Sequence, residues 1–186
     1  MRRTLALAAA LPLLATPALA QQRDLTGYQN PAARAAVPLT TEIRDTSNEA
    51  LQATLYELVA LKHDTHQAHW NVTGPLFYSL HDLLGEVYQG LEPYIDQVAE
   101  RKRALGVAAD ARNGAVAQNA EVGPIEAGLL TDKQVLVQLL EEYAVVAERI
   151  EGRIEATSDD PITQDLLIDV GRTVEKDLWM IRAFQL

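Results

Sequence analysis

Residues 51–75, LQATLYELVALKHDTHQAHWNVTGP, decide how this chain folds. Three leucines in this stretch recur at the spacing of one helix face: Leu51, Leu55 and Leu58. Continuing the same steps leads to His69, so we expect this histidine to project from the core-facing side near the helix end. The turn residues 71–74 should end the helix, and Pro75 should be the first residue of a second helix.

The helical pattern continues outward from this stretch into four amphipathic helices. Their start signals, in chain order, are Thr40 and Thr41, Pro75, a capping box of Thr131 and Gln134, and Asp160 with Pro161. Residues 106–130 are rich in alanine and glycine, and we expect a long connection with a short helix near 125–130. No strand pattern competes. Helices of about 25 to 30 residues predict an all-α, antiparallel four-helix bundle with this long connection between the second and third helices.

The N-terminus has the pattern of a cleavable secretory signal. Arg2 and Arg3 are followed by an apolar stretch and then by Ala18-Leu19-Ala20, a typical cleavage site. The apolar stretch is too short to span a bilayer as a helix, which requires about 20 residues. We therefore expect a periplasmic or secreted protein that has no membrane segment after cleavage. The expected divisions are a signal peptide at 1–20, an irregular N-terminal arm at 21–40 and the four-helix domain at 41–186.

Charge and composition exclude some kinds of partner and site. The chain has a net charge of −10, which becomes −12 when Arg2 and Arg3 are removed. This charge disfavours binding to DNA and attracts cations. The chain has no cysteine, so any metal must be held by histidine and carboxylate side chains.

Histidines and carboxylates form two candidate ligand groups. All four histidines lie between positions 63 and 81, and Asp96 and Glu100 stand one helical turn apart, facing away from the apolar stripe of their helix. His81 and Asp96 are separated by about 22 Å along one helix, so they could share an ion only if a second subunit brings them together. The alternatives are solvated carboxylates on a helix surface, a partly exposed imidazole after a turn at His81, and a buried imidazole hydrogen-bonded to backbone at His69. We interpret His63 and His66 as surface or neighbouring residues rather than ligands.

Several spaced blocks of the chain resemble the DNA protection during starvation (Dps) family of ferritin-like proteins. They are residues 65–75 (THQAHWNVTGP), Leu80-His81, Asp96, Ala99-Glu100-Arg101 and Leu178-Trp179-Met180. The resemblance implies a twelve-subunit hollow shell that oxidises ferrous iron at two-fold interfaces, usually with hydrogen peroxide, and stores the ferric product. It also implies that His69 and His81 of one subunit, with Asp96 and Glu100 of its neighbour, form the catalytic metal site. Trp70 resembles the family's tryptophan beside the iron centre, although it could equally be an aromatic anchor of the bundle.

Two further features bear on this interpretation. The family commonly has an acidic ligand for the weaker iron position four residues after the second histidine, and here that residue is Gly85. An acidic group near the end of the third helix resembles the lining of the family's pores, or is a solvated helix junction: Glu151, Glu155, Asp159, Asp160 and Asp165.

The sequence thus leaves three functions to compare. The first is an iron-oxidising storage shell that protects against oxidative damage. The second is DNA compaction through a basic N-terminal arm, although this arm has only Arg23 and Arg34 against Asp24. The third is a metal-buffering cage whose centre is weakened at Gly85.

Overall fold

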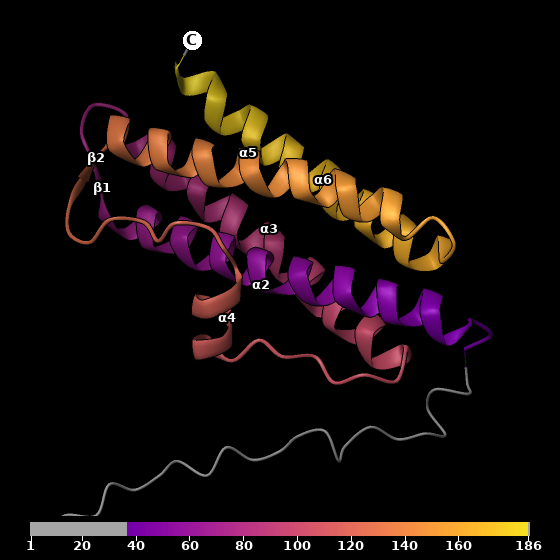
Figure 1. The fold of residues 1–186 in the computed structure, drawn as a ribbon. Coiled ribbons are helices and arrows are strands. Elements are labelled where there is room, and N and C mark those ends of the chain that lie inside the picture. Colours follow the sequence, from indigo (N-terminus) through magenta and orange to yellow (C-terminus); the bar gives the residue numbers. More distant parts are fainter. Residues whose placement is uncertain (1–36, 186) are drawn as a thin grey trace, which may run out of the picture.

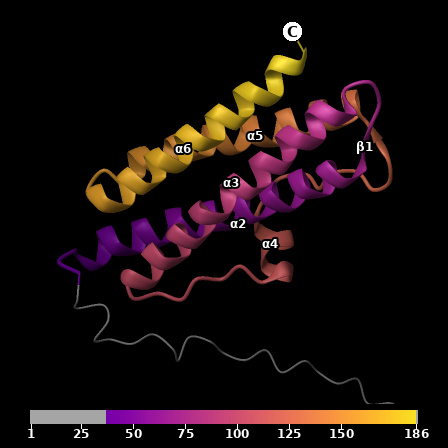
Figure 2. The same cartoon turned by 180° about the vertical axis from the view of Figure 1, so that it is seen from behind.

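Four long helices pack as two antiparallel pairs, α2 with α3 and α5 with α6 (Figures 1 and 2). The structure is a computed structural model and describes residues 37–185. The long helices are α2 (Thr41–Asn71), α3 (Phe77–Ala104), α5 (Asp132–Ala156) and α6 (Pro161–Arg182). The shorter elements are α4 (Asn113–Asn119), the strands β1 (Val72–Thr73) and β2 (Leu130–Thr131), and a 3₁₀ turn at Ala183–Gln185. The predicted all-α four-helix bundle is confirmed.

Local capping signals start three of the long helices where the sequence predicts. Thr40 accepts a hydrogen bond from the backbone N–H of Ile43, and Thr131 and Gln134 form the expected capping box. Asp160 caps α6, with Pro161 in its first turn. The second start differs from the prediction because Pro75 lies in the turn, and α3 begins at Phe77 and continues through Pro93.

The long connection differs from the prediction in two respects. Its short helix is α4 at Asn113–Asn119, packed on α2, rather than near 125–130. The connection also forms a short parallel pairing of β1 with β2, in which Val72 is paired with Leu130. This pairing joins the turn after α2 to the start of α5 at one end of the bundle (Figure 1). Each strand has only two residues, and the two strands are far apart in the sequence. No periodic pattern in the sequence therefore predicts their pairing.

The core is built from the apolar stripes of the four long helices. Leu51, Leu55 and Leu58 are fully buried, as their spacing predicts. Thr65 continues their stripe and shares a hydrogen bond of 2.9 Å with the buried hydroxyl of Tyr143, which satisfies both polar groups. The stripe therefore fixes the rotation of α2, and with it the direction of the histidines near its end.

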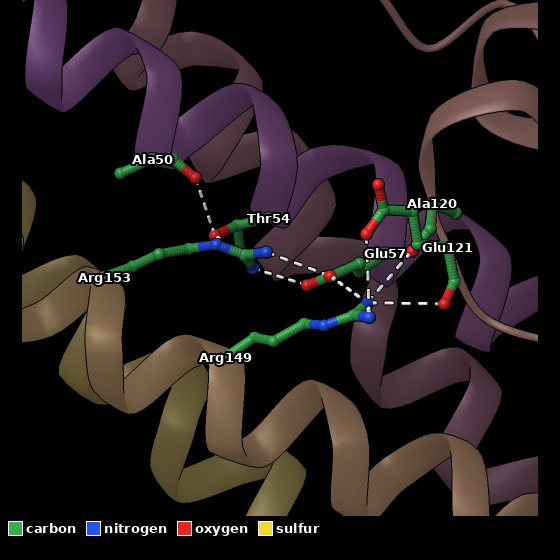
Figure 3. A network of polar contacts seen from close by, with 7 residues as sticks. All are labelled: Ala50, Thr54, Glu57, Ala120, Glu121, Arg149 and Arg153. Carbon is green, nitrogen blue, oxygen red and sulfur yellow. Dashed lines mark hydrogen bonds and ion pairs between the residues drawn. The ribbon is translucent and has the colours of Figure 1, made fainter.

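A buried carboxylate ties the long connection to the bundle (Figure 3). Glu57 of α2 is 3% exposed and accepts hydrogen bonds from Arg149 and Arg153 of α5. Arg149 also donates to the backbone carbonyls of Ala120 and Glu121, at the end of α4. We call Glu57, Arg149 and Arg153 the arginine clamp. It holds three separate segments together where α2, α5 and the connection meet.

A second buried carboxyl, Glu142 of α5, predicts a specific pH dependence. Burial, with the nearby Asp64 and Glu141 carboxylates, raises the pKa of Glu142 to about 8. Its Oε2 has no hydrogen-bond partner within residues 37–185. The folded state therefore holds a proton that the unfolded chain has lost, so stability should fall as the pH rises from about 4.5 to 8.

We expect Glu142→Gln to remove most of this dependence, because the amide keeps the shape of the side chain without its charge. Between pH 6 and 9 the wild-type chain should lose about 2 kcal/mol that the variant retains. Urea unfolding at both pH values measures the difference. Glu148→Gln, at an exposed position on the same helix, is the matched control. Equal pH dependence in the wild type and Glu142→Gln would contradict the expectation.

The expectations for the N-terminus fall largely outside the structure. The signal peptide at 1–20 and the arm at 21–40, except for its last four residues, lie outside the described residues. From residue 37 to 185, no helix is long and apolar enough to cross a membrane.

Candidate metal centre

His69 and His81 hold each other in place through reciprocal hydrogen bonds. His69 lies near the end of α2, and His81 lies in the first turns of α3. The Nδ1 atom of His69 is 2.7 Å from the carbonyl oxygen of His81, and the Nδ1 atom of His81 is 2.9 Å from the carbonyl oxygen of His69. The two rings stack with centroids 3.8 Å apart and planes inclined by 20°. The turn after α2 is what brings these residues, twelve positions apart, into contact.

The hydrogen bonds determine which ring nitrogen of each histidine can bind a metal. A carbonyl oxygen can only accept, so each Nδ1 carries the proton and donates it. Each Nε2 then keeps its lone pair, as in metal sites where a second group fixes the tautomer of a histidine ligand. Both residues are half-buried in the single chain.

Aromatic rings extend this pair along the same face. His66 stacks on Tyr88 of α3 with centroids 3.8 Å apart and lies 3.9 Å from the ring of Trp70. Burial and, to a smaller degree, the nearby His69 lower the pKa of His66. His66 is half-buried between two rings and beside His69, which agrees with its interpretation as a neighbouring residue rather than as a surface residue. Trp70 is 60% exposed in the single chain, so it does not anchor the bundle core.

Asp96 and Glu100 lie on the outer face of α3. Both are exposed, as their spacing relative to the apolar stripe predicts. Within residues 37–185 of one chain, no three histidine or acidic side chains come together in a way that could hold a metal. The two imidazoles and the two carboxylates therefore occupy separate places on one subunit, and a site that used all four would require a second copy of the chain.

Gly85 packs directly against the candidate centre. A Cβ atom at this position would lie 3.3 Å from Cε1 and 3.4 Å from Nδ1 of His69. Such a contact is tight, so a larger residue at 85 would have to shift the ring that Nδ1 holds in place. The absence of a side chain at Gly85 is therefore part of how His69 and His81 stack.

Asp160, one member of the acidic group, is buried, whereas a residue that lines a pore must be accessible to solvent. Asp160 is 1% exposed and accepts hydrogen bonds from Ser47, Arg101 and Thr163. Burial alone would raise the pKa of Asp160, but the hydrogen bonds from Thr163, Ser47 and Arg101 outweigh it, and the pKa is lowered. Asp160 therefore joins the end of α3 to α2 and α6. The other four members are exposed: Glu151, Glu155, Asp159 and Asp165.

The sequence interpretation missed two groups. For the first group, the ring stack of His66 and Tyr88, the sequence does contain a signal. His66 stands three residues before His69 on one helix face, which indicates that it lies beside the candidate centre. The arginine clamp has no such signal, because Glu57 lies more than ninety positions before both arginines in the chain.

Known proteins match this chain over most of its length. A family model described as a ferritin-like domain matches residues 48–185. DNA protection during starvation protein 2 of Deinococcus radiodurans is 41% identical over 145 residues, which is 77% of this chain and 60% of that protein. The fine tangled pili major subunit of Haemophilus ducreyi is 33% identical over 88% of this chain and 87% of that protein.

Solved structures agree with the sequence matches. The Dps of Microbacterium arborescens in its high iron form is 27% identical and superposes with a TM-score of 0.76, covering 81% of this chain and 99% of that one. That protein and this chain therefore share the four-helix bundle. Together with the ferritin-like domain at residues 48–185 and the likeness to the Deinococcus protein, this places the chain in the Dps family of ferritin-like proteins.

Proposed function

We propose that this chain is one subunit of a hollow shell, a dodecamer in the manner of its family, that binds ferrous iron between subunits, oxidises it and stores the ferric product. The observation that carries the proposal is the reciprocal hydrogen bonding of His69 and His81, which leaves both Nε2 lone pairs available for a metal. Asp96 and Glu100 of a neighbouring subunit supply the carboxylates. Imidazole and carboxylate together suit iron, and the chain has no thiolate to compete.

The stacked rings favour two ions at each centre. A metal bound to an imidazole lies near the plane of that ring, and the planes of His69 and His81 are 3.8 Å apart at the centroids and inclined by only 20°. One ion cannot lie close to both planes, so each histidine serves its own ion. The stacking distance matches the separation of about 3.5–4 Å that is usual in two-metal sites.

Two ferrous ions at one centre balance the reduction of one peroxide molecule. Each ferrous ion gives one electron, and the two electrons with two protons convert hydrogen peroxide to two water molecules. Both oxygen atoms of peroxide are then reduced together, and no hydroxyl radical is released. The expected consequence is protection against oxidative damage. The names of the Dps relatives describe the protection of DNA during starvation by those proteins.

Export and the lack of DNA binding complete the proposal. We infer a periplasmic or secreted location from the signal pattern at 1–20, and one of the relatives is named as a pilus subunit of its own organism. DNA compaction is disfavoured by a net charge of −12 after cleavage and by an arm with only Arg23 and Arg34 as basic residues.

The test of this function is iron loading of the assembled protein. Ferrous iron is added without oxygen, and peroxide or air is then admitted while absorbance and particle size are followed. We expect rapid oxidation with peroxide, a ferric product that stays soluble inside a large particle of unchanged size, and no gel shift of DNA at physiological salt. A stable monomer with full oxidation activity would contradict the proposal. Tight iron binding without turnover would instead indicate the metal-buffering cage.

A further inference from the structure

The segment between α4 and β2 passes two buried carboxyl groups. We call its residues 120–126 the strap. Asp64 of α2 lines one hollow beside the strap, and Glu142 of α5 lines another. Val122 and Pro124 border both hollows, so the middle of the strap lies next to both carboxyl groups. The side chain of Asp64 is 13% exposed, and Glu142 is 7% exposed.

Glu142 lacks the partners that a buried charge needs. Within residues 37–185, its Oε2 atom has no hydrogen-bond partner. The charges that act on it there are the carboxylates of Asp64 and Glu141, and Glu121 of the strap lines the same hollow. Arg149, about two turns along α5, is engaged in the arginine clamp. The surroundings therefore favour the neutral, protonated form of Glu142 while the strap is in place.

Only a few polar contacts hold the strap on the bundle. At its start, Arg149 donates to two backbone carbonyl oxygens at 3.4 Å (Figure 3). At its end, the backbone N–H of Glu126 donates to Oε1 of Gln138 at 2.8 Å. The backbone N–H of Ile125 faces Asp64 closely enough to favour the charged form of that carboxyl. None of these contacts belongs to the hydrogen-bond ladder of a helix, so the strap can open while the four long helices stay folded.

The geometry points to a pH-sensitive strap: residues 120–126 stay closed over Glu142 while this carboxyl is protonated, and they open when it loses its proton. An ionised Glu142 in the closed state would lie near the Asp64 and Glu141 carboxylates without a cation to offset them. Opening returns the charge to water and removes the cost of its burial. The inference goes beyond the proposed function, because it uses none of the metal ligands and needs no iron.

The two states of Glu142 give the direction of the pH dependence. In the closed state, burial and the neighbouring carboxylates raise the pKa of Glu142 from 4.5 to about 8. In the open state, water restores the ordinary pKa. The closed strap is therefore most stable below pH 4.5, and its opening should become about tenfold more favourable for each pH unit up to 8. Above pH 8 both states are ionised, so the dependence should level off.

Hydrogen exchange of the assembled, full-length protein, followed by mass spectrometry of its peptides, tests the inference. After correction for the intrinsic exchange rate, the protection of residues 120–126 should fall about a hundredfold between pH 6 and 8. Residues 51–58 of α2, in the core, should remain unexchanged over the same labelling times. Glu142→Gln should abolish the pH dependence of the strap. Glu148→Gln, at an exposed position of α5, is the matched control and should behave as the wild type does.

Three results would overturn the pH-sensitive strap. The first is equal protection of residues 120–126 at pH 6 and 8 in the wild type, and the second is an unchanged pH dependence in Glu142→Gln. The third is equal exchange of residues 51–58, because the strap would then open only when the whole bundle unfolds. Asp64→Asn provides a second check, since it removes a charge that raises the pKa of Glu142 and should make the dependence level off below pH 8. Levelling at an unchanged pH in Asp64→Asn would also contradict the inference.

Discussion

Asp96→Ala and Glu100→Ala should each slow the peroxide-driven oxidation of ferrous iron by at least about a hundredfold. Both carboxylates lie on the outer face of α3 and are exposed in the single chain. In the proposed centre they act together with His69 and His81 of a neighbouring subunit. Loss of either one removes a charged ligand from both ions, and the remaining imidazoles hold ferrous iron weakly.

The fold should not change in these variants. Neither side chain contributes to the core, so the circular dichroism spectrum and the particle size should match those of the wild type. Glu86→Ala is the matched control, because it removes an exposed carboxylate from the same helix and should leave the rate of oxidation unchanged. Wild-type rates in Asp96→Ala and Glu100→Ala would show that the carboxylates of the centre lie elsewhere.

Glu57→Ala is expected to lower the free energy of unfolding by about 3–5 kcal/mol. The substitution leaves the guanidinium groups of Arg149 and Arg153 near the core without their carboxylate, and the Arg153 side chain is only 16% exposed. It also weakens the hold of Arg149 on the carbonyls of Ala120 and Glu121. Glu121 has a φ of 53°, so the arginine clamp fixes a residue in the left-handed region.

Chemical denaturation measures this effect against a surface ion pair. Lys62 and Glu92 form a salt bridge between α2 and α3, and their side chains are 33% and 61% exposed. Glu92→Ala should therefore cost at most about 1 kcal/mol. Similar losses in Glu57→Ala and Glu92→Ala would mean that the arginine clamp does not stabilise the bundle more than a surface pair does.

Features that depend on local sequence were predicted well. The capping box of Thr131 and Gln134 and the start of α6 at Asp160 follow from side chains that bind their own backbone within three residues. The leucine stripe of α2 also gave the correct side of the helix for His69. Each of these signals lies within one or two helical turns, so a single sequence contains it in full.

Features that depend on distant contacts were not predicted. The β1–β2 pairing and the placement of α4 on α2 depend on how the long connection crosses the bundle. Asp160 was grouped with residues of a pore lining or a solvated helix junction, because its partner Arg101 is 59 positions away and cannot be identified from the pattern. His66 was set aside because its partner Tyr88 belongs to the next helix, where only the tertiary fold brings the two rings together.

The centre itself was predicted as two halves that one chain cannot join. The length of α3 between His81 and Asp96 excludes a shared ion within a subunit, and the structure places the imidazoles and the carboxylates apart on one chain. What the sequence could not supply is the reciprocal hydrogen bonding of His69 and His81, which depends on the turn between α2 and α3.

Mixed assembly of two inactive variants tests the shared centre most directly. His81→Ala and Asp96→Ala chains are unfolded together, reassembled and assayed for peroxide-driven oxidation of ferrous iron. In a two-fold dimer of one chain of each kind, one of the two centres receives His81 and Asp96 intact, so random mixing should restore about a quarter of the wild-type rate. Each variant reassembled alone should stay inactive. Mixed assemblies as inactive as the separate variants, at normal particle size, would contradict a centre built between subunits.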